Sequence, residues 1–100
     1  MKARLEVYND RDELAGYVLL EVHRGELHVS WINVHPSERG RGFGTRLMQM
    51  AVDYAKRRGM AVVTGFIDTS SGDVKARIRF FKRLGEISYL NGALRFMIKA

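Results

Sequence analysis

Three glycines at alternating positions, Gly40, Gly42 and Gly44, separate a predicted strand from a predicted helix. Glycine adopts positive φ without strain and lets the backbone approach a ligand closely. The first amides of a helix lack partners within the helix, and the helix dipole adds partial positive charge at that end. Arg39 and Arg41 add two cationic side chains to the same segment. The segment therefore predicts a cradle for a phosphate or diphosphate group.

The spacing within this segment excludes two well-known phosphate loops. A Walker A loop needs a Gly-Lys dipeptide, which the sequence does not contain. A dinucleotide fingerprint that started at Gly40 would need a glycine at position 45, where Thr45 stands. The strand before the loop also belongs to a predicted antiparallel meander and not to an opening βαβ unit.

The elements around the loop predict the fold class. Before it, three strands joined by short polar turns form an antiparallel meander. After it come an amphipathic helix, an apolar run typical of a strand buried on both faces, a second helix and a closing hairpin. The predicted ranges are strands 3–8, 14–23, 26–34 and 60–67, helices 44–57 and 73–84, and hairpin strands 86–90 and 93–99. The order β-β-β-α-β-α-β-β predicts an α/β (α+β) domain, with two helices flanking a mixed, largely antiparallel sheet.

Length and composition set further bounds. A chain of 100 residues predicts one domain, residues 1–100. The absence of cysteine excludes a disulfide framework, a cysteine zinc site and a thiol nucleophile, and we expect no metal. With 17 Lys and Arg against 11 Asp and Glu, the net charge of +6 attracts nucleic acid, anionic lipid or a phosphorylated small molecule. No signal peptide and no apolar run near the roughly 20 residues of a membrane span are visible, so we expect a cytoplasmic chain without a membrane partner.

The pattern Arg39-x-x-Gly42-x-Gly44 follows a strand that ends in Val34-His35-Pro36 and precedes an amphipathic helix. It resembles the coenzyme A pyrophosphate loop, Gln/Arg-x-x-Gly-x-Gly/Ala, of the GCN5-related N-acetyltransferase (GNAT) superfamily. The segment Phe80-Phe81-Lys82-Arg83-Leu84-Gly85 resembles the end of the second helix of that family, and the resemblance covers residues 14–99. It implies a GNAT-like fold and an acetyl-CoA-dependent N-acetyltransferase whose amine acceptor attacks the thioester directly.

The resemblance also implies where acetyl-CoA lies. It places the coenzyme between two splayed parallel strands, the one ending at Val34 and the one at 60–67. Backbone groups at the end of the first strand meet the pantetheine and the thioester, and the Val34 backbone polarises the thioester carbonyl and stabilises the oxyanion. The amides of residues 40–45 hold the pyrophosphate. The implied coenzyme-binding residues are Ile32, Asn33, Val34, Arg39, Gly40, Arg41, Gly42, Phe43, Gly44 and Thr45.

Catalytic groups follow the family pattern only in part. Several relatives carry a glutamate eleven positions before the Gln/Arg of the loop, and the same count from Arg39 gives His28, the candidate general base. Weaker candidates are Glu21, His23 and Glu26. Many relatives carry a tyrosine as general acid where this chain has Phe81, which has no proton to donate. Relatives often have a coenzyme-contacting asparagine where Val74 stands; Ser70, Ser71 or Asp73 could replace it.

Several alternatives stay open at this point. The same fold could serve as a weakly active or inactive coenzyme A-binding or protein-interaction module. The basic residues of the two helices could form a nucleic-acid-binding surface, although charges on the outer faces of amphipathic helices are usually solvated. The resemblance implies a short form without the usual N-terminal strand and helices, so the acceptor site is expected to be shallow, open or completed by a second subunit of a homodimer. Trp31 and Tyr17 either line that site or pack in the core.

Overall fold

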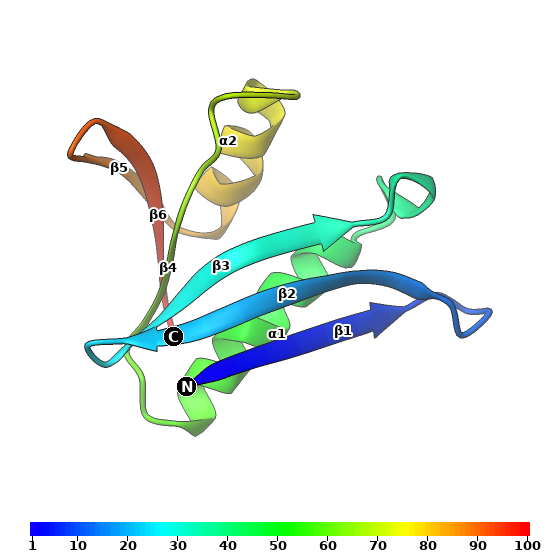
Figure 1. The fold of residues 1–100 in the computed structure, drawn as a ribbon, viewed down its shortest axis with the longest axis horizontal. Coiled ribbons are helices and arrows are strands. Elements are labelled where there is room, and N and C mark those ends of the chain that lie inside the picture. Colours follow the sequence, from blue (N-terminus) through cyan, green and yellow to red (C-terminus); the bar gives the residue numbers. More distant parts are fainter.

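The computed structural model describes residues 1–100 and contains six strands and two α-helices in the predicted order. A single 3₁₀ turn, Pro36–Glu38, precedes the first helix and was not predicted. The elements, shown in Figure 1, are β1 (Lys2–Tyr8), β2 (Leu14–His23), β3 (Glu26–Val34), α1 (Phe43–Arg57), β4 (Val62–Phe66), α2 (Val74–Leu84), β5 (Glu86–Leu90) and β6 (Ala93–Lys99).

The clearest boundary difference concerns β4, which was predicted over 60–67. The Met60 amide donates to the carbonyl of Ala55, so this residue belongs to the end of α1 and not to the strand. The Ile67 amide donates to the carbonyl of Leu94 just beyond the paired part of the strand. Burial on both faces is confirmed for Val63, Thr64 and Gly65, whereas Phe66 is exposed.

The sheet is mixed, with the order β1-β2-β3-β4-β6-β5. All neighbouring strands are antiparallel except β3 and β4, which run parallel. These two pair over only three positions, from Leu27 opposite Val63 to Val29 opposite Gly65, and then diverge (Figure 1). The predicted pair of splayed parallel strands is therefore present, and we call the space beyond their last pair the β3–β4 opening.

A β-bulge at Ser30 marks the place where the two strands part. Trp31 pairs with Leu19 and Val29 pairs with Leu20, so Ser30 has no partner on β2. Before the bulge Leu27 and Val29 are buried, and after it Ile32 and Val34 pack against the core, because one extra residue shifts the alternation. A bulge also bends its strand and increases the local twist. β3 therefore turns away from β4 directly after Val29.

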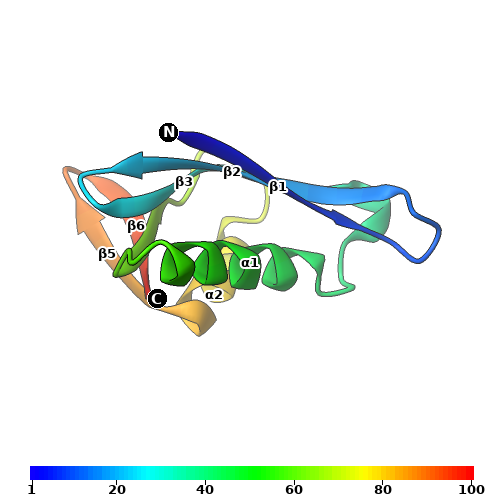
Figure 2. The ribbon, with the colours of Figure 1, turned by 90° about the horizontal axis from the view of Figure 1, so that it is seen from below.

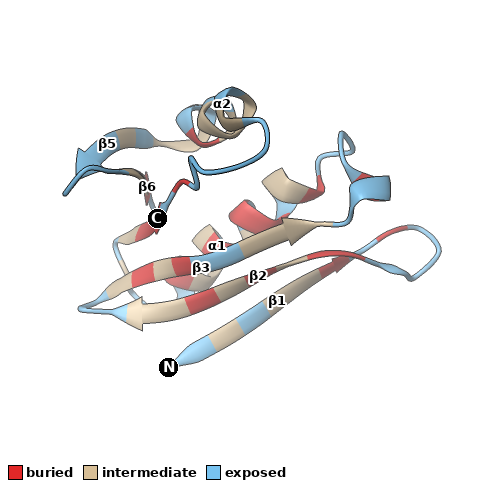
Figure 3. Cartoon of the chain, turned by 45° about the horizontal axis from the view of Figure 1, so that its top comes forward, coloured by how far each residue is buried: buried red, intermediate tan, exposed pale blue.

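Both helices lie on one side of strands β1–β3 (Figure 2). α1 buries one apolar stripe against these strands, and the buried positions of β2, β3 and α1 are red in Figure 3. No element covers the opposite face of β1–β3 (Figure 2). Neither helix combines the length and the apolar character that a membrane span requires.

Packing of α2 on the sheet depends on aromatic rings and one glycine. The Phe81 ring stacks on the Phe96 ring, with 4.1 Å between centroids and 6° between planes. A Cβ at Gly65 would lie 2.5 Å from the Phe96 ring, so only glycine leaves β4 enough room beneath this stack. Residues from α2, β4 and β6 thus meet in one core cluster beside the β3–β4 opening.

Candidate functional site

The glycine-rich loop has the backbone conformation that only glycine adopts easily. Gly40 and Gly42 have φ of +78° and +83°, in the left-handed region, and Gly42 is the N-cap of α1. No atom lies within 4 Å of the position that a Cβ would take at either residue, so both face open space. At Gly44 a Cβ would meet the Phe80 ring at 3.5 Å, an ordinary contact.

The backbone amides of this loop are the groups that could bind a ligand. The amides of residues 40–45 donate no hydrogen bond within the chain, and the first bond of α1 runs from the Arg46 amide to the Gly42 carbonyl at 3.0 Å. No side chain caps the helix. Free donors at a helix N-terminus bind anions because the helix dipole adds to their partial charges. The structure thus brings together the loop residues from Gly40 to Thr45 that the sequence singled out.

The two loop arginines make different contacts. Arg39 Nε lies 3.4 Å from the carbonyl oxygen of Val34, so this side chain folds back over the end of β3. Arg41 Nη1 lies 3.7 Å from Oε2 of Glu38. Glu38 is only 5% exposed, and its Oε1 accepts a 2.8 Å hydrogen bond from Nδ2 of Asn9. Sequence patterns did not predict this pair, because Asn9 lies in a polar turn and Glu38 had no assigned role.

The end of β3 presents backbone groups to the β3–β4 opening. The His35 amide donates to the carbonyl of Ala15 on β2 at 2.8 Å. Backbone groups in an antiparallel pair alternate between facing the partner strand and facing away from it. The backbone amide of Asn33 therefore faces β2, as that of His35 does. The backbone amides of Ile32 and Val34 face the other side, where β4 has diverged. Of the three residues predicted here, Ile32 and Val34 have the free donors.

His28 lies at the vertex of the opening, in register with Thr64. Its Nδ1 is 3.4 Å from Thr64 Oγ1, and its ring meets the rings of His23 and Phe66 edge to face, at centroid distances of 5.4 and 5.9 Å. Burial lowers the pKa of His28 below its ordinary 6.5, and the positive charge of a protonated His23 lowers it further. The imidazole is therefore mainly neutral at pH 7 and able to accept a proton.

The weaker candidates for general base are engaged in ion pairs. Glu21 Oε2 lies 2.9 Å from His23 Nε2, and this hydrogen bond lowers the pKa of the Glu21 carboxyl. Glu26 Oε2 lies 3.2 Å from Nη2 of Arg95. No three His, Asp or Glu side chains gather in a way that could hold a metal ion.

The position at which the resemblance implies a general acid is filled by a core residue. Phe81 is 4% exposed and stacked on Phe96. Tyr89 and Ser88 carry hydroxyl groups that could donate a proton in its place, but they lie on β5, which β6 separates from β4 and the opening. No proton donor therefore stands in for the missing tyrosine among these residues.

The polar residues that could replace the coenzyme-contacting asparagine have partners within the chain. The hydroxyls of Ser70 and Ser71 lie 2.5 and 3.5 Å from the carboxylate of Asp68. The Asp73 carboxylate caps α2 by accepting a 3.0 Å hydrogen bond from the Ala76 amide. All three side chains thus order the loop before α2.

Aromatic side chains flank the opening on the uncovered face of the sheet. Trp31 is 54% exposed, so the alternative that it packs in the core is wrong, and Phe66 is 53% exposed. Tyr17 lies under the guanidinium of Arg4, which is 3.9 Å from its ring centroid. Trp31 on β3 and Phe66 on β4 therefore leave apolar surface free on both sides of the opening.

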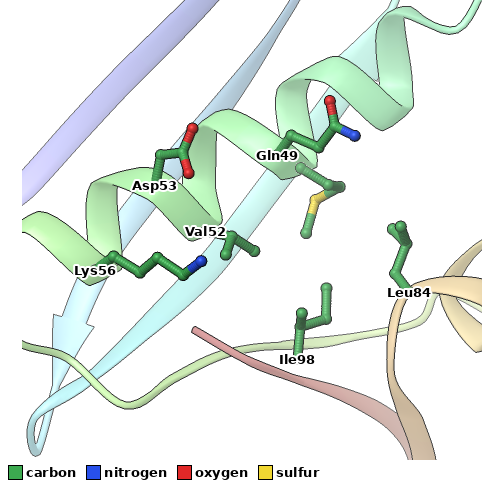
Figure 4. Close-up of a pocket in the computed structure, with 7 residues that line it drawn as sticks. Gln49, Val52, Asp53, Lys56, Leu84 and Ile98 are labelled. Carbon is green, nitrogen blue, oxygen red and sulfur yellow. The ribbon is translucent and has the colours of Figure 1, made fainter.

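A separate hollow of about 240 Å³ lies on the helical side of the sheet (Figure 4). Met48, Val52, Leu84 and Ile98 form its apolar walls. It opens beside the middle and the C-terminal half of α1, whereas the glycine-rich loop precedes the N-terminus of that helix. The hollow is therefore not part of the site described above.

Comparisons with known proteins agree with the sheet topology. Residues 3–85 match the family model described as Acetyltransferase (GNAT) family. An uncharacterized N-acetyltransferase of Methanocaldococcus jannaschii is 41% identical over 74 residues, which are 72% of this chain and 30% of that protein.

Solved structures share the fold. The PaiA N-acetyltransferase of Thermoplasma acidophilum in complex with coenzyme A has a TM-score of 0.84 at 14% identity, covering 99% of this chain and 61% of that one. Nourseothricin acetyltransferase has a TM-score of 0.79 at 23% identity, with 98% and 65% covered. The Escherichia coli ribosomal-protein-S18-alanine N-acetyltransferase has a TM-score of 0.80 at 17% identity, with 98% and 68% covered. The chain thus spans less than a third of the curated relative and about two thirds of these solved chains.

Proposed function

The chain belongs to the Acetyltransferase (GNAT) family, and from that premise we propose that it transfers an acetyl group from acetyl-CoA to an amine. The observation that carries the proposal is the row of free amides at residues 40–45, held open by two glycines at positive φ. A diphosphate bound there satisfies donors that the protein leaves unpaired. Arg39 adds positive charge beside it.

The thioester end of the coenzyme lies in the β3–β4 opening in this proposal. The amides of Ile32 and Val34 face that space and hold the pantetheine and the thioester. β3 rises about 3.3 Å per residue, so Val34 is roughly 20 Å along the strand from His28 and Ile32 is roughly 13 Å. We therefore assign the acetyl carbonyl to the Ile32 amide, two residues from the sequence-based choice of Val34, because it is nearer to the base.

The chemistry is direct acyl transfer. The neutral amine attacks the acetyl carbon and forms the C–N bond. The backbone donor stabilises the resulting oxyanion, and its collapse breaks the C–S bond. His28 receives the proton of the amine through water that fills the remaining distance along the opening. The coenzyme leaves as a thiolate without a proton from Phe81, which is feasible because a thiol pKa is about 8.5.

The acceptor reaches this chemistry from the uncovered face of the sheet, between Trp31 and Phe66. Both side chains are about half exposed and stand on opposite strands of the opening. Their ring faces attract an ammonium group before it loses its proton and pack against the carbon skeleton of the amine.

Calorimetric titration with acetyl-CoA tests the coenzyme site. Gly42→Glu and Gly44→Glu place bulk and negative charge in the loop and should abolish binding. Gly92→Glu is the matched control, because Gly92 has φ of +81°, faces open space and lies in the β5–β6 turn. Unchanged binding by the two loop variants would remove the loop from the site.

A second candidate function keeps coenzyme binding without turnover, and the apolar Phe81 favours it. Release of coenzyme A from acetyl-CoA in the presence of a panel of amines separates the two. Turnover with any amine supports the transferase. Binding without turnover across aliphatic, aromatic and peptide amines supports the binding module.

A further inference from the structure

Glu38 is a buried carboxylate beside the coenzyme loop. Its side chain is 6% exposed, and one oxygen, Oε1, accepts the hydrogen bond from Asn9. The other oxygen, Oε2, is buried and accepts no hydrogen bond. A buried charge is costly unless a counter-charge or hydrogen bonds compensate it.

Arg41 is the cation that lies next to this oxygen, at 3.7 Å. Its side chain is largely exposed, so the pair joins a buried anion to a solvated cation. Arg41 stands between Gly40 and Gly42, the two residues that give the loop its shape. The contact with Glu38 therefore fixes the loop from its middle.

Asn9 fixes the other side of Glu38. Its Oδ1 accepts from the amides of Arg11 and Glu13, both at 2.9 Å, and its Nδ2 also donates to Glu13 at 3.2 Å. The β1–β2 turn is thereby held around a single amide side chain. The bond from Asn9 to Glu38 then ties this turn to the loop.

We infer that Asn9, Glu38 and Arg41 form a strut that holds the glycine-rich loop in its anion-binding shape, and that Arg41 contributes to coenzyme binding through Glu38. This inference rests on the proposed function for its ligand. It differs from the sequence-based expectation, in which Arg41 touches the diphosphate. The amides of residues 40–45 and Arg39 then carry the diphosphate, while Arg41 remains the counter-charge of Glu38.

A double-mutant series with coenzyme A in calorimetry distinguishes the two roles of Arg41. Arg41→Met leaves Glu38 without its counter-charge, and we expect about tenfold weaker binding. Adding Glu38→Gln removes the buried charge but keeps an acceptor for Asn9, so the pair of substitutions should restore affinity to within about threefold of the wild type. Asn9→Ala should weaken binding as Arg41→Met does.

Arg11→Met is the matched control, because Arg11 forms an exposed pair with Glu13 at 3.0 Å in the neighbouring turn. It should leave binding unchanged. If the double variant binds as weakly as Arg41→Met alone, Arg41 contacts the coenzyme directly and the inference is wrong.

Thermal unfolding without coenzyme supplies a second, independent readout. A strut predicts that Arg41→Met lowers the midpoint by roughly 5 °C and that Glu38→Gln in the same chain restores it. Equal midpoints for the wild type and Arg41→Met would overturn the inference. A wild type that binds no coenzyme A would instead contradict the proposed function, while the unfolding series would still decide the strut.

Discussion

Phe81 lies flat on Phe96, with their centroids 4.1 Å apart, at the position where the family resemblance implies a proton-donating tyrosine. The contact joins α2 to β6, and the Phe96 ring leaves no room for a Cβ at Gly65 of β4. Phe81, which has no proton to donate, is thus a buried packing residue here. In the proposed mechanism, the thiolate therefore leaves without a proton from this position.

Gly65→Ala tests this packing. The added methyl group would lie 2.5 Å from the Phe96 ring, so ring or strand must move. We expect the free energy of unfolding to fall by about 1–3 kcal/mol in denaturant titration. Gly44→Ala is the control, because its methyl group meets Phe80 at 3.5 Å and should cost little stability. Equal stability of Gly65→Ala and the wild type would contradict the contact.

His28→Gln should lower kcat/KM for acetyl transfer by about a hundredfold or more, because a positioned base contributes that much. Since burial lowers the pKa of His28, the wild-type rate should fall only as the pH drops below 6.5, when the ring gains a proton. His28→Gln should lose this acid limb. A variant that retains the limb would assign it to another group.

His23→Gln and Glu21→Gln should move the pKa of His28 in opposite directions. The positive charge on His23 lowers that pKa and the negative charge on Glu21 raises it. The pKa of His28, followed through its imidazole resonances by NMR over pH 4–9, should therefore be higher in His23→Gln and lower in Glu21→Gln than in the wild type. Shifts of the same sign would show that the two charges do not act on His28 separately.

Gly16→Ala should disturb the end of β3. A methyl group there would lie 2.6 Å from the Asn33 carbonyl oxygen and 3.2 Å from Cα of Val34. We expect roughly tenfold weaker acetyl-CoA binding, because the donors of Ile32 and Val34 would no longer align with the opening. Circular dichroism should confirm that the variant is folded, and unchanged affinity would argue against this strand end as a coenzyme contact.

Local signals made most of the fold predictable. Alternating apolar residues, glycine turns and helix periodicity lie close together in the sequence, so the element order was correct and the boundaries were nearly so. The loop was predictable for the same reason, since Gly40, Gly42 and Gly44 are neighbours. The resemblance added the splayed strands, which no local signal could supply.

What the sequence could not supply are relationships that depend on register and tertiary contact. The bulge at Ser30 leaves only a broken alternation, with apolar residues at 27, 29, 32 and 34, which is also compatible with an irregular strand. The bond between Asn9 and Glu38 joins positions that are 29 residues apart. The exposure of Trp31 follows from the bulge, so this exposure could not be predicted without knowledge of the bulge.

Three residue pairs between β3 and β4 join two groups of strands in the sheet, β1–β3 and β4–β6–β5. Besides these few ladder hydrogen bonds, the packing of α1 against both strand groups resists a rotation of one group against the other. If coenzyme A binds in the β3–β4 opening as proposed, we expect a small rotation of this kind to widen the opening when coenzyme A leaves, without unfolding either strand group. The rigidity of the β3–β4 pairing, together with the affinity of the loop for coenzyme A, would then govern how quickly the product leaves.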